Sequence, residues 1–118
     1  ILLGQRKNAH GSGTWAFPGG HLEYHEAIEA CARREVFEET NLVVKNIKHI
    51  AYTNDIFRQE QKHYVTLFVL AQYDSGDLEI REPDKCEKWD WFHWDKLPEP
   101  MFLPLKNFIQ QGHHLNQI

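Results

Sequence analysis

Three glutamates, Glu35, Glu38 and Glu39, stand within five residues of one another and are the most informative feature of the chain. If this segment is a helix, side chains three and four positions apart are neighbours, so the three carboxylates lie on one patch. Three carboxylates repel one another unless a cation lies among them. A hard divalent cation that prefers oxygen ligands, such as Mg²⁺, meets that need. The pattern therefore predicts a magnesium-dependent protein that acts on phosphates.

The segment from Glu26 to Asn41 is the element that must position these glutamates, and its pattern predicts a helix. We expect the helix to start near Glu26 and to end at Thr40–Asn41, since Asn tolerates the left-handed conformation that often follows a helix. An apolar residue recurs at every fourth position and gives a buried stripe beside the glutamates, formed by Ile28, Ala32 and Val36.

Strand patterns occupy much of the remaining chain. We expect strands at 42–53 and 63–73, with the VTLFVL segment of the second as a central strand. The aromatic run 88–94 is expected to be a strand covered on both faces, and 105–111 an amphipathic helix. Helices interleaved with strands predict a single α/β domain over residues 1–118, with a mixed sheet between helical layers.

Composition narrows the function classes. A chain of 118 residues supports one domain with a core but not two. The net charge of −4 and the pI near 6.0 exclude an overall basic field, so we expect no DNA-binding element, and an anionic substrate requires local cations. The apolar runs are too short to span a bilayer. Two cysteines without a pairing or metal-ligand pattern are typical of a cytoplasmic protein.

The beginning of the chain also carries an expectation. Residue 1 is Ile, in the apolar run ILLGQR, and neither an initiator Met nor a signal-peptide pattern is present. We therefore expect the sequence to be part of a longer protein and to lack a first N-terminal strand.

The stretch from Gly20 to Leu42 resembles the Nudix box, G-x5-E-x7-R-E-U-x-E-E-x-G-U, in which U is a large apolar residue. The matching positions are Gly20, Glu26, Arg34, Glu35, Val36, Glu38, Glu39 and Leu42. Asn41 stands where the family has Gly, and His25 stands where a Gly often precedes the first Glu. The preceding run W-x-F-P-G-G-H, from Trp15 to His21, is also similar to the family. The resemblance implies a Nudix-type α/β/α sandwich with a central mixed sheet.

The resemblance implies a division of roles among the residues of the box. Glu35, Glu38 and Glu39 would bind Mg²⁺, with Mn²⁺ as a substitute, and the backbone carbonyl of Gly19 or Gly20 is a further ligand candidate. Glu39 and Glu35 are the first candidates for metal ligands. The base that activates water is expected to be either Glu39 or an acid on a later loop.

Two charged residues would support these ligands. Arg34 is four residues from Glu38 and would orient a carboxylate through a charge-assisted contact. Glu26, at the expected helix start, is assigned a structural role because the positive end of the helix dipole favours an acid there.

A glutamate on a later loop is the other candidate base. Glu87, just before the aromatic run, is the first choice, and Glu82 and Asp84 compete with it. The substrate-binding candidates lie elsewhere: Gly20, where the missing side chain lets the backbone approach a ligand, His21, Phe17 and Phe57.

For activity, the resemblance implies that water hydrolyses a nucleoside diphosphate linked to another group. The chain lacks the marks of three branches. The ADP-ribose branch often carries a Pro after the box, but this chain has no Pro between Pro18 and Pro83. The dinucleoside polyphosphate branch tends to have a Tyr in the same region, where this chain has Ile56–Arg58. Arg6 and Gly13 are too close together for the coenzyme A branch.

The remaining resemblance is to the MutT-type branch. It implies cleavage of (deoxy)nucleoside triphosphates to monophosphate and pyrophosphate, with a role in nucleotide-pool sanitation. Three alternatives stay open: hydrolysis of ADP-ribose or a nucleotide sugar, hydrolysis at RNA 5′ ends, and a nucleotide-binding module without catalysis. A homodimer also stays open.

Overall fold

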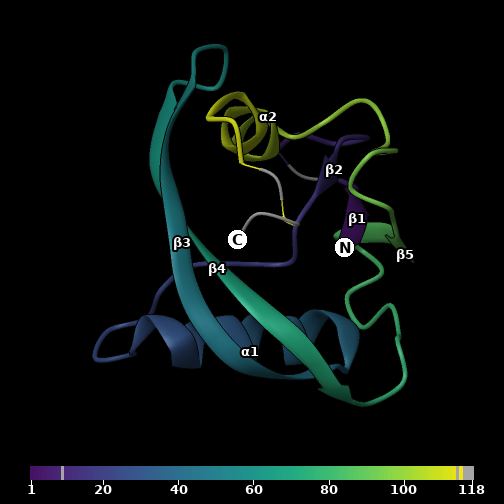
Figure 1. Ribbon diagram of the computed structural model, residues 1–118. Helices are drawn as coiled ribbons and strands as arrows, with labels where there is room; N and C mark the ends of the chain where they lie inside the picture. The colour runs from purple at the N-terminus through teal and green to yellow at the C-terminus, as the bar shows by residue number, and fades with distance from the viewer. Residues whose placement is uncertain (9, 114, 116–118) are drawn as a thin grey trace.

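The structure is a computed structural model that describes residues 1–8, 10–113 and 115 (Figure 1). Its helices are α1 (Ile28–Thr40) and α2 (Leu103–Gln110). Its strands are β1 (Leu2–Arg6), β2 (Trp15–Ala16), β3 (Val43–Phe57), β4 (Lys62–Ser75) and β5 (Cys86–Trp91). In the described part of the chain, no helix is long and apolar enough to cross a membrane.

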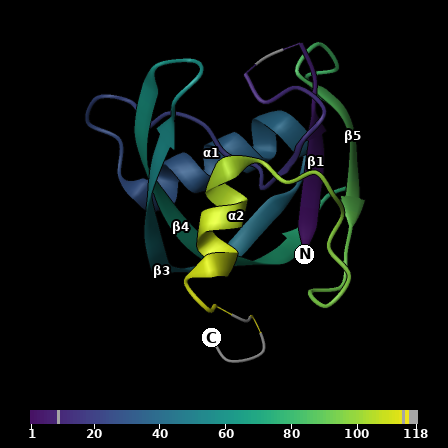
Figure 2. The ribbon, with the colours of Figure 1, turned by 90° about the horizontal axis from the view of Figure 1, so that it is seen from above.

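The strands form two antiparallel sheets, one with the order β2-β1-β5 and one consisting of the long hairpin β3-β4. A parallel bridge joins Trp15 to Met101 beside the first sheet. Figure 1 shows α1 and α2 on opposite sides, with the hairpin running between them, and Figure 2 gives the same arrangement from above. The expected α/β class is confirmed, although the named strands pair in antiparallel ladders rather than in a single mixed sheet.

Two expectations about strand burial are wrong. The VTLFVL segment lies in β4, whose partner in its sheet is β3, so it is not a central strand. Its Val65 and Leu67 are 62% and 49% exposed, because alternate side chains of this hairpin face away from the core. The aromatic run is not covered on both faces either, since β5 ends at Trp91 and the side chain of Trp91 is 53% exposed.

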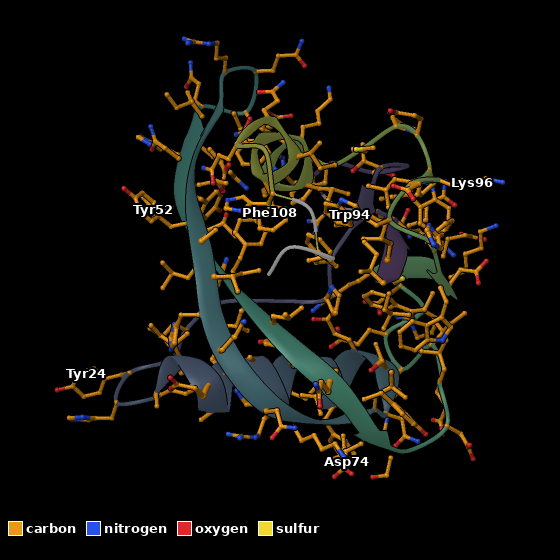
Figure 3. All side chains as sticks on the ribbon, in the orientation of Figure 1. Tyr24, Tyr52, Asp74, Trp94, Lys96 and Phe108 are labelled. Atoms are coloured by element: carbon orange, nitrogen blue, oxygen red, sulfur yellow. The ribbon has the colours of Figure 1, made fainter. Side chains whose placement is uncertain are left out.

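The core lies between α2 and the strands. Leu3, Trp15 and Leu105 form its buried centre, and Phe108 is also buried. Figure 3 shows Phe108 directed from α2 into the interior and Tyr52 directed away from the hairpin. This packing sets the two helices apart on either side of the hairpin.

A buried carboxylate fastens α2 to the hairpin. Asp55 of β3 has no exposed surface, and its oxygens accept hydrogen bonds from three side chains. The donors are the hydroxyl groups of Thr53 and Thr66 and, at 2.8 Å, the amide group of Asn107 in α2. These donors satisfy the hydrogen-bonding capacity of a carboxylate that is shielded from water.

The helix that carries the glutamates ends as predicted. α1 stops at Thr40, and Asn41 follows with φ 68°, in the left-handed region. The backbone N–H of Asn41 donates to the carbonyl of Phe37 and closes the last turn. The start of the helix is two residues later than Glu26, at Ile28. Glu26 therefore lies just outside the helix, directly before the N-cap residue Ala27.

Candidate active site

Arg34 is the centre of the acidic cluster on α1. Its Nε and Nη2 donate to the two carboxylate oxygens of Glu26 at 2.7 and 2.9 Å. Its Nη1 donates to Glu35 at 2.8 Å and to Glu38 at 3.3 Å, and Nη2 also reaches the carbonyl of His21. The expected contact with Glu38 is present. One guanidinium therefore holds acids from the preceding loop and from α1 together.

Glu26 owes its position to this arginine. The hydrogen bonds from Arg34 lower the pKa of the Glu26 carboxyl to about 2, so the side chain is ionised at neutral pH. One of its oxygens also accepts from the backbone N–H of Glu23 at 3.1 Å. Glu26 thus closes the loop before α1 onto the helix, which is the structural role expected for it but with a different physical cause.

Gly19 and Gly20, which precede α1 in the chain, lie next to carboxyl groups of that helix. A Cβ on residue 20 would lie closer than 2.5 Å to the carboxyl carbon and both oxygens of Glu35, so only Gly leaves room for that carboxyl group. Gly19 has open space around its α-carbon, and its backbone N–H donates to Glu39 at 3.1 Å. The Gly19–Gly20 backbone thus lies against Glu35 and Glu39.

Glu39 is the carboxyl group with the most perturbed acidity. Burial raises its pKa to about 8, and the nearby charges of Glu35 and Glu82 act in the same direction. The hydrogen bond from Gly19 opposes this shift without cancelling it. A carboxylate in such surroundings must gain either a proton or a cation. Strongly shifted acids of this kind are typical of functional sites.

A divalent cation fits this donor set, because Glu39 forms no ion pair in the described part of the chain and lies against a second carboxyl group. As the side chains stand, no three His, Cys, Asp or Glu groups among residues 1–8, 10–113 and 115 surround one point at metal-binding distance. Glu35 and Glu38 are turned towards Arg34 instead. The ligand roles of Glu35, Glu38, Glu39 and Gly19 stay predictions.

Of the three loop acids considered, Glu82 is the one whose charge raises the pKa of Glu39. Arg81 donates its backbone N–H to the carbonyl of Glu39 at 3.2 Å, which brings the neighbouring Glu82 to the end of α1. Glu87 lies on β5, half-exposed, with its carboxylate 3.5 Å from the ammonium of Lys7. Asp84 is exposed. The first-choice assignment of Glu87 therefore has a better-placed competitor in Glu82.

The substrate-binding candidates differ in accessibility. His21 is exposed and stacks on Tyr64 at a centroid distance of 6.0 Å. Phe17 packs edge-on against Phe68 and Phe108 in the core. Phe57 is 7% exposed, which leaves little of its ring to stack on a base. His21 is therefore the most accessible of the three side chains.

Arg6 is a candidate for the site that the sequence reasoning did not assign. It ends β1, its Nε donates to the carbonyl of His10 at 2.7 Å, and its guanidinium carbon lies 4.1 Å from the ring centre of Phe102. Burial lowers the pKa of Arg6, and the charge of Glu39 counteracts this. The requirement for a local cation in an acidic chain was the signal that could have pointed to Arg6.

The NUDIX domain family model matches residues 1–112. The chain is 35% identical over 99 residues to an NAD-capped RNA hydrolase NudC of Edwardsiella ictaluri, covering 84% of this chain and 36% of that protein. It is 34% identical over 109 residues to the NudC of Photorhabdus laumondii, covering 92% and 39%. The chain thus spans little more than a third of the length of these relatives.

Solved structures give the same family. A MutT NUDIX hydrolase from Burkholderia pseudomallei matches with a TM-score of 0.84 and 32% identity, covering 92% of this chain and 83% of that chain. The NUDIX domain of Shewanella oneidensis NrtR, solved with ADP ribose, matches with a TM-score of 0.74 at 24% identity, covering 94% and 73%, and shares the fold. The chain belongs to the Nudix family, as the sequence pattern predicted.

Proposed function

We propose that this chain is a Mg²⁺-dependent hydrolase of nucleotide phosphoanhydride bonds, and that its main substrate is a (deoxy)nucleoside triphosphate, cleaved to monophosphate and pyrophosphate. The observation that carries the proposal is Glu39, a half-buried carboxyl group with a pKa raised to about 8, set against Glu35 and the Gly19–Gly20 backbone. This arrangement requires a cation when both acids are ionised.

The chain's own residues have distinct roles in this proposal. Glu35, Glu38 and Glu39 would hold the metal ion, with the Gly19 carbonyl as an additional ligand, and Arg34, which binds Glu35 and Glu38, would support these carboxylates from the other side. When bound, such an ion would supply positive charge for the phosphate oxygens. Either Glu39 or Glu82 accepts a proton from water, whose oxygen attacks phosphorus while the bond to the bridging oxygen breaks. Arg6 supplies positive charge near Glu39 for the anionic substrate.

The charge distribution favours a small nucleotide over RNA. The chain has a net charge of −4, and lysines of its surface pair with acids: Lys7 with Glu87, Lys45 with Asp74, and Lys85 with Glu82. A protein that follows an RNA backbone needs a basic groove. The second candidate substrate is NAD or an NAD-capped RNA end, which the names of the NudC relatives support.

One panel of substrates separates these possibilities. The chain is incubated with Mg²⁺ and a nucleoside triphosphate, NAD, ADP-ribose, a triphosphorylated RNA or an NAD-capped RNA, and the products are separated by chromatography. We expect monophosphate and pyrophosphate from the triphosphate, and loss of both with EDTA. If NAD or the NAD-capped RNA is cleaved while the nucleoside triphosphate is not, the second candidate substrate is the correct one.

Two controls define the reaction. Hydrolysis in ¹⁸O-labelled water identifies the attacked phosphorus, because the label enters the monophosphate only if water attacks the α-phosphorus. The Glu39→Gln variant tests catalysis itself. If it cleaves as fast as the wild type, Glu39 has no part in the reaction. Binding of nucleotide without cleavage of any substrate would identify a binding module instead.

A further inference from the structure

Asn41 forms three side-chain hydrogen bonds at the end of α1. Its Nδ2 donates to the backbone carbonyl of Asp77 at 3.1 Å and to a carboxylate oxygen of Glu79 at 3.0 Å. Its Oδ1 accepts from Nη1 of Arg81 at 2.8 Å. One amide group therefore contacts three alternate residues of the segment 77–81, which precedes Glu82. The left-handed backbone of Asn41 accounts for none of these side-chain contacts, since Gly adopts that conformation more readily.

The same segment is attached to α1 through its backbone. Glu79 donates its N–H to the carbonyl of Thr40 at 3.0 Å, and Arg81 donates to the carbonyl of Glu39 at 3.2 Å. The guanidinium of Arg81 also lies over the ring of Phe37, 5.3 Å from its centre. The end of α1 and the segment 77–81 therefore form one connected unit.

Glu82 is fixed from its other side as well. Its backbone carbonyl accepts hydrogen bonds from the N–H groups of Lys85 at 2.9 Å and Cys86 at 3.1 Å, which form the turn into β5. Its side chain is 36% exposed, and its carboxylate is 4.0 Å from the ammonium of Lys85 in the same turn, so the surrounding protein restricts it only in part. The position of its carboxylate relative to Glu39 therefore depends on how firmly the preceding residues are held.

We propose that Asn41 is a positioning residue, whose side-chain amide holds residues 77–81 on the end of α1 and thereby sets Glu82 against Glu39 for the attack of water. This inference rests on the proposed hydrolase function and identifies Glu82 as the loop acid that takes part in it. Asn41 then has two roles: its backbone ends the helix in a left-handed conformation, and its side chain holds the segment 77–81. The second role requires a side chain with both a hydrogen-bond donor and an acceptor.

The Asn41→Gly variant isolates the side chain. Gly keeps the left-handed conformation and removes all three hydrogen bonds. Asn46→Gly is the matched control, because Asn46 also has a positive φ of 52° and an exposed side-chain hydrogen bond, to Gln72 on the hairpin. We expect kcat of Asn41→Gly to fall by about tenfold or more, since small misplacements of catalytic groups cost up to about 10²-fold. We expect its KM, and both constants of Asn46→Gly, to stay near wild type.

Hydrogen exchange provides a readout that does not depend on activity. The backbone amides of Glu79 and Arg81 should exchange faster in Asn41→Gly than in the wild type, and those of α1 before residue 37 should not. Unchanged exchange at both amides would overturn the proposal, because the side chain would then not hold the segment. Equal loss of kcat in Asn41→Gly and Asn46→Gly would overturn it as well.

A double-mutant cycle tests whether Asn41 acts through Glu82. In a Glu82→Gln background, Asn41→Gly should lower kcat by less than about twofold, since its effect is already lost with the carboxylate. If the loss of kcat in the double variant equals the product of the losses in the two single variants, the inference is overturned. If Glu82→Gln cleaves at the wild-type rate while Glu39→Gln is inactive, the proposed function stands and this inference fails. If the wild type cleaves no nucleotide, the proposed function and the catalytic part of the inference fail, and hydrogen exchange alone still reports on the contact.

Discussion

Replacing Gly20 by Ala is the sharpest test of how the backbone shapes the site. The new Cβ would lie closer than 2.5 Å to the carboxyl carbon and both oxygens of Glu35, whereas ordinary contact begins at 3.4 Å. The carboxyl group must therefore move by about 1 Å, and a displacement of that size at a catalytic group can cost about 10²-fold in rate. We expect kcat of Gly20→Ala to fall by about that factor.

Stability should not follow activity in this variant. The atoms that must move are the far end of a flexible side chain, and Gly20 does not have a positive φ, so alanine is compatible with its backbone. Such a change gains about 0.4–1 kcal/mol by restricting the unfolded chain, which offsets part of the lost contact between Glu35 and Arg34. The free energy of unfolding in urea should therefore stay close to that of the wild type.

The assay compares kcat, KM and urea unfolding of Gly20→Ala with those of Gly19→Ala. Nothing lies within 4 Å of a Cβ at residue 19, and alanine keeps the backbone N–H that donates to Glu39. The smaller loss of activity is therefore expected for Gly19→Ala. Wild-type kcat in Gly20→Ala at saturating Mg²⁺, or equal losses in the two variants, would refute the reasoning.

Three further predictions follow from single groups. Glu39→Gln should lower kcat by about 10²–10⁴-fold, the range for loss of an acid or base that acts in the reaction, while Glu87→Gln stays near wild type; steady-state kinetics measures both. Asp55→Ala should lower the free energy of unfolding by about 3 kcal/mol or more, because it leaves one buried donor, Thr53, and two half-buried donors, Thr66 and Asn107, without their acceptor; urea unfolding measures this. Burial lowers the pKa of His10 below its ordinary 6.5, so the unfolded chain binds the proton more tightly. His10 should therefore contribute a loss of stability as the pH drops below about 6.5, whereas Glu39, whose pKa is raised to about 8 in the folded chain, contributes in the opposite direction. Thermal unfolding at several pH values should show that His10→Leu removes the first contribution and leaves the second.

The fold class and the helix of the site could be predicted because their signals are local. The apolar spacing along α1 and the helix-ending Asn41 depend on residues within a few positions of one another. The expected buried stripe was less accurate, because Ile28, Ala32 and Val36 are only half-buried and the buried residues of α1 are Cys31 and Thr40. Whether the faces of a strand are buried by other elements could not be predicted in the same way. An apolar run such as VTLFVL indicates a strand, but whether a second layer covers Val65 and Leu67 depends on residues far away in the chain.

The chemistry of the box shows the same division. The sequence pattern indicated which acids belong together, but not that Arg34 binds four of them, including Glu23 at 3.7 Å in addition to those of the box. Nor did it show that Glu35 occupies the space next to Gly20. Both facts depend on how the loop before α1 folds back onto the helix, which the spacing of residues along the chain leaves open.

The loop acid illustrates why sequence proximity is a poor guide to a site. Glu87 was the first choice because it directly precedes the aromatic run. In the structure it lies at the irregularity of the β1–β5 ladder, between the partners of Gln5 and Arg6, and its carboxylate is 3.5 Å from the ammonium of Lys7. Glu82 lies farther from any recognisable motif, but the hydrogen bonds of Glu79 and Arg81 to the last turn of α1 carry it to the acids of the box. The position of such a residue is determined by the contacts of its neighbours. For this reason we expect that substitution of Asn41, more than substitution of any residue in the aromatic run, will reveal which acid takes part in the reaction.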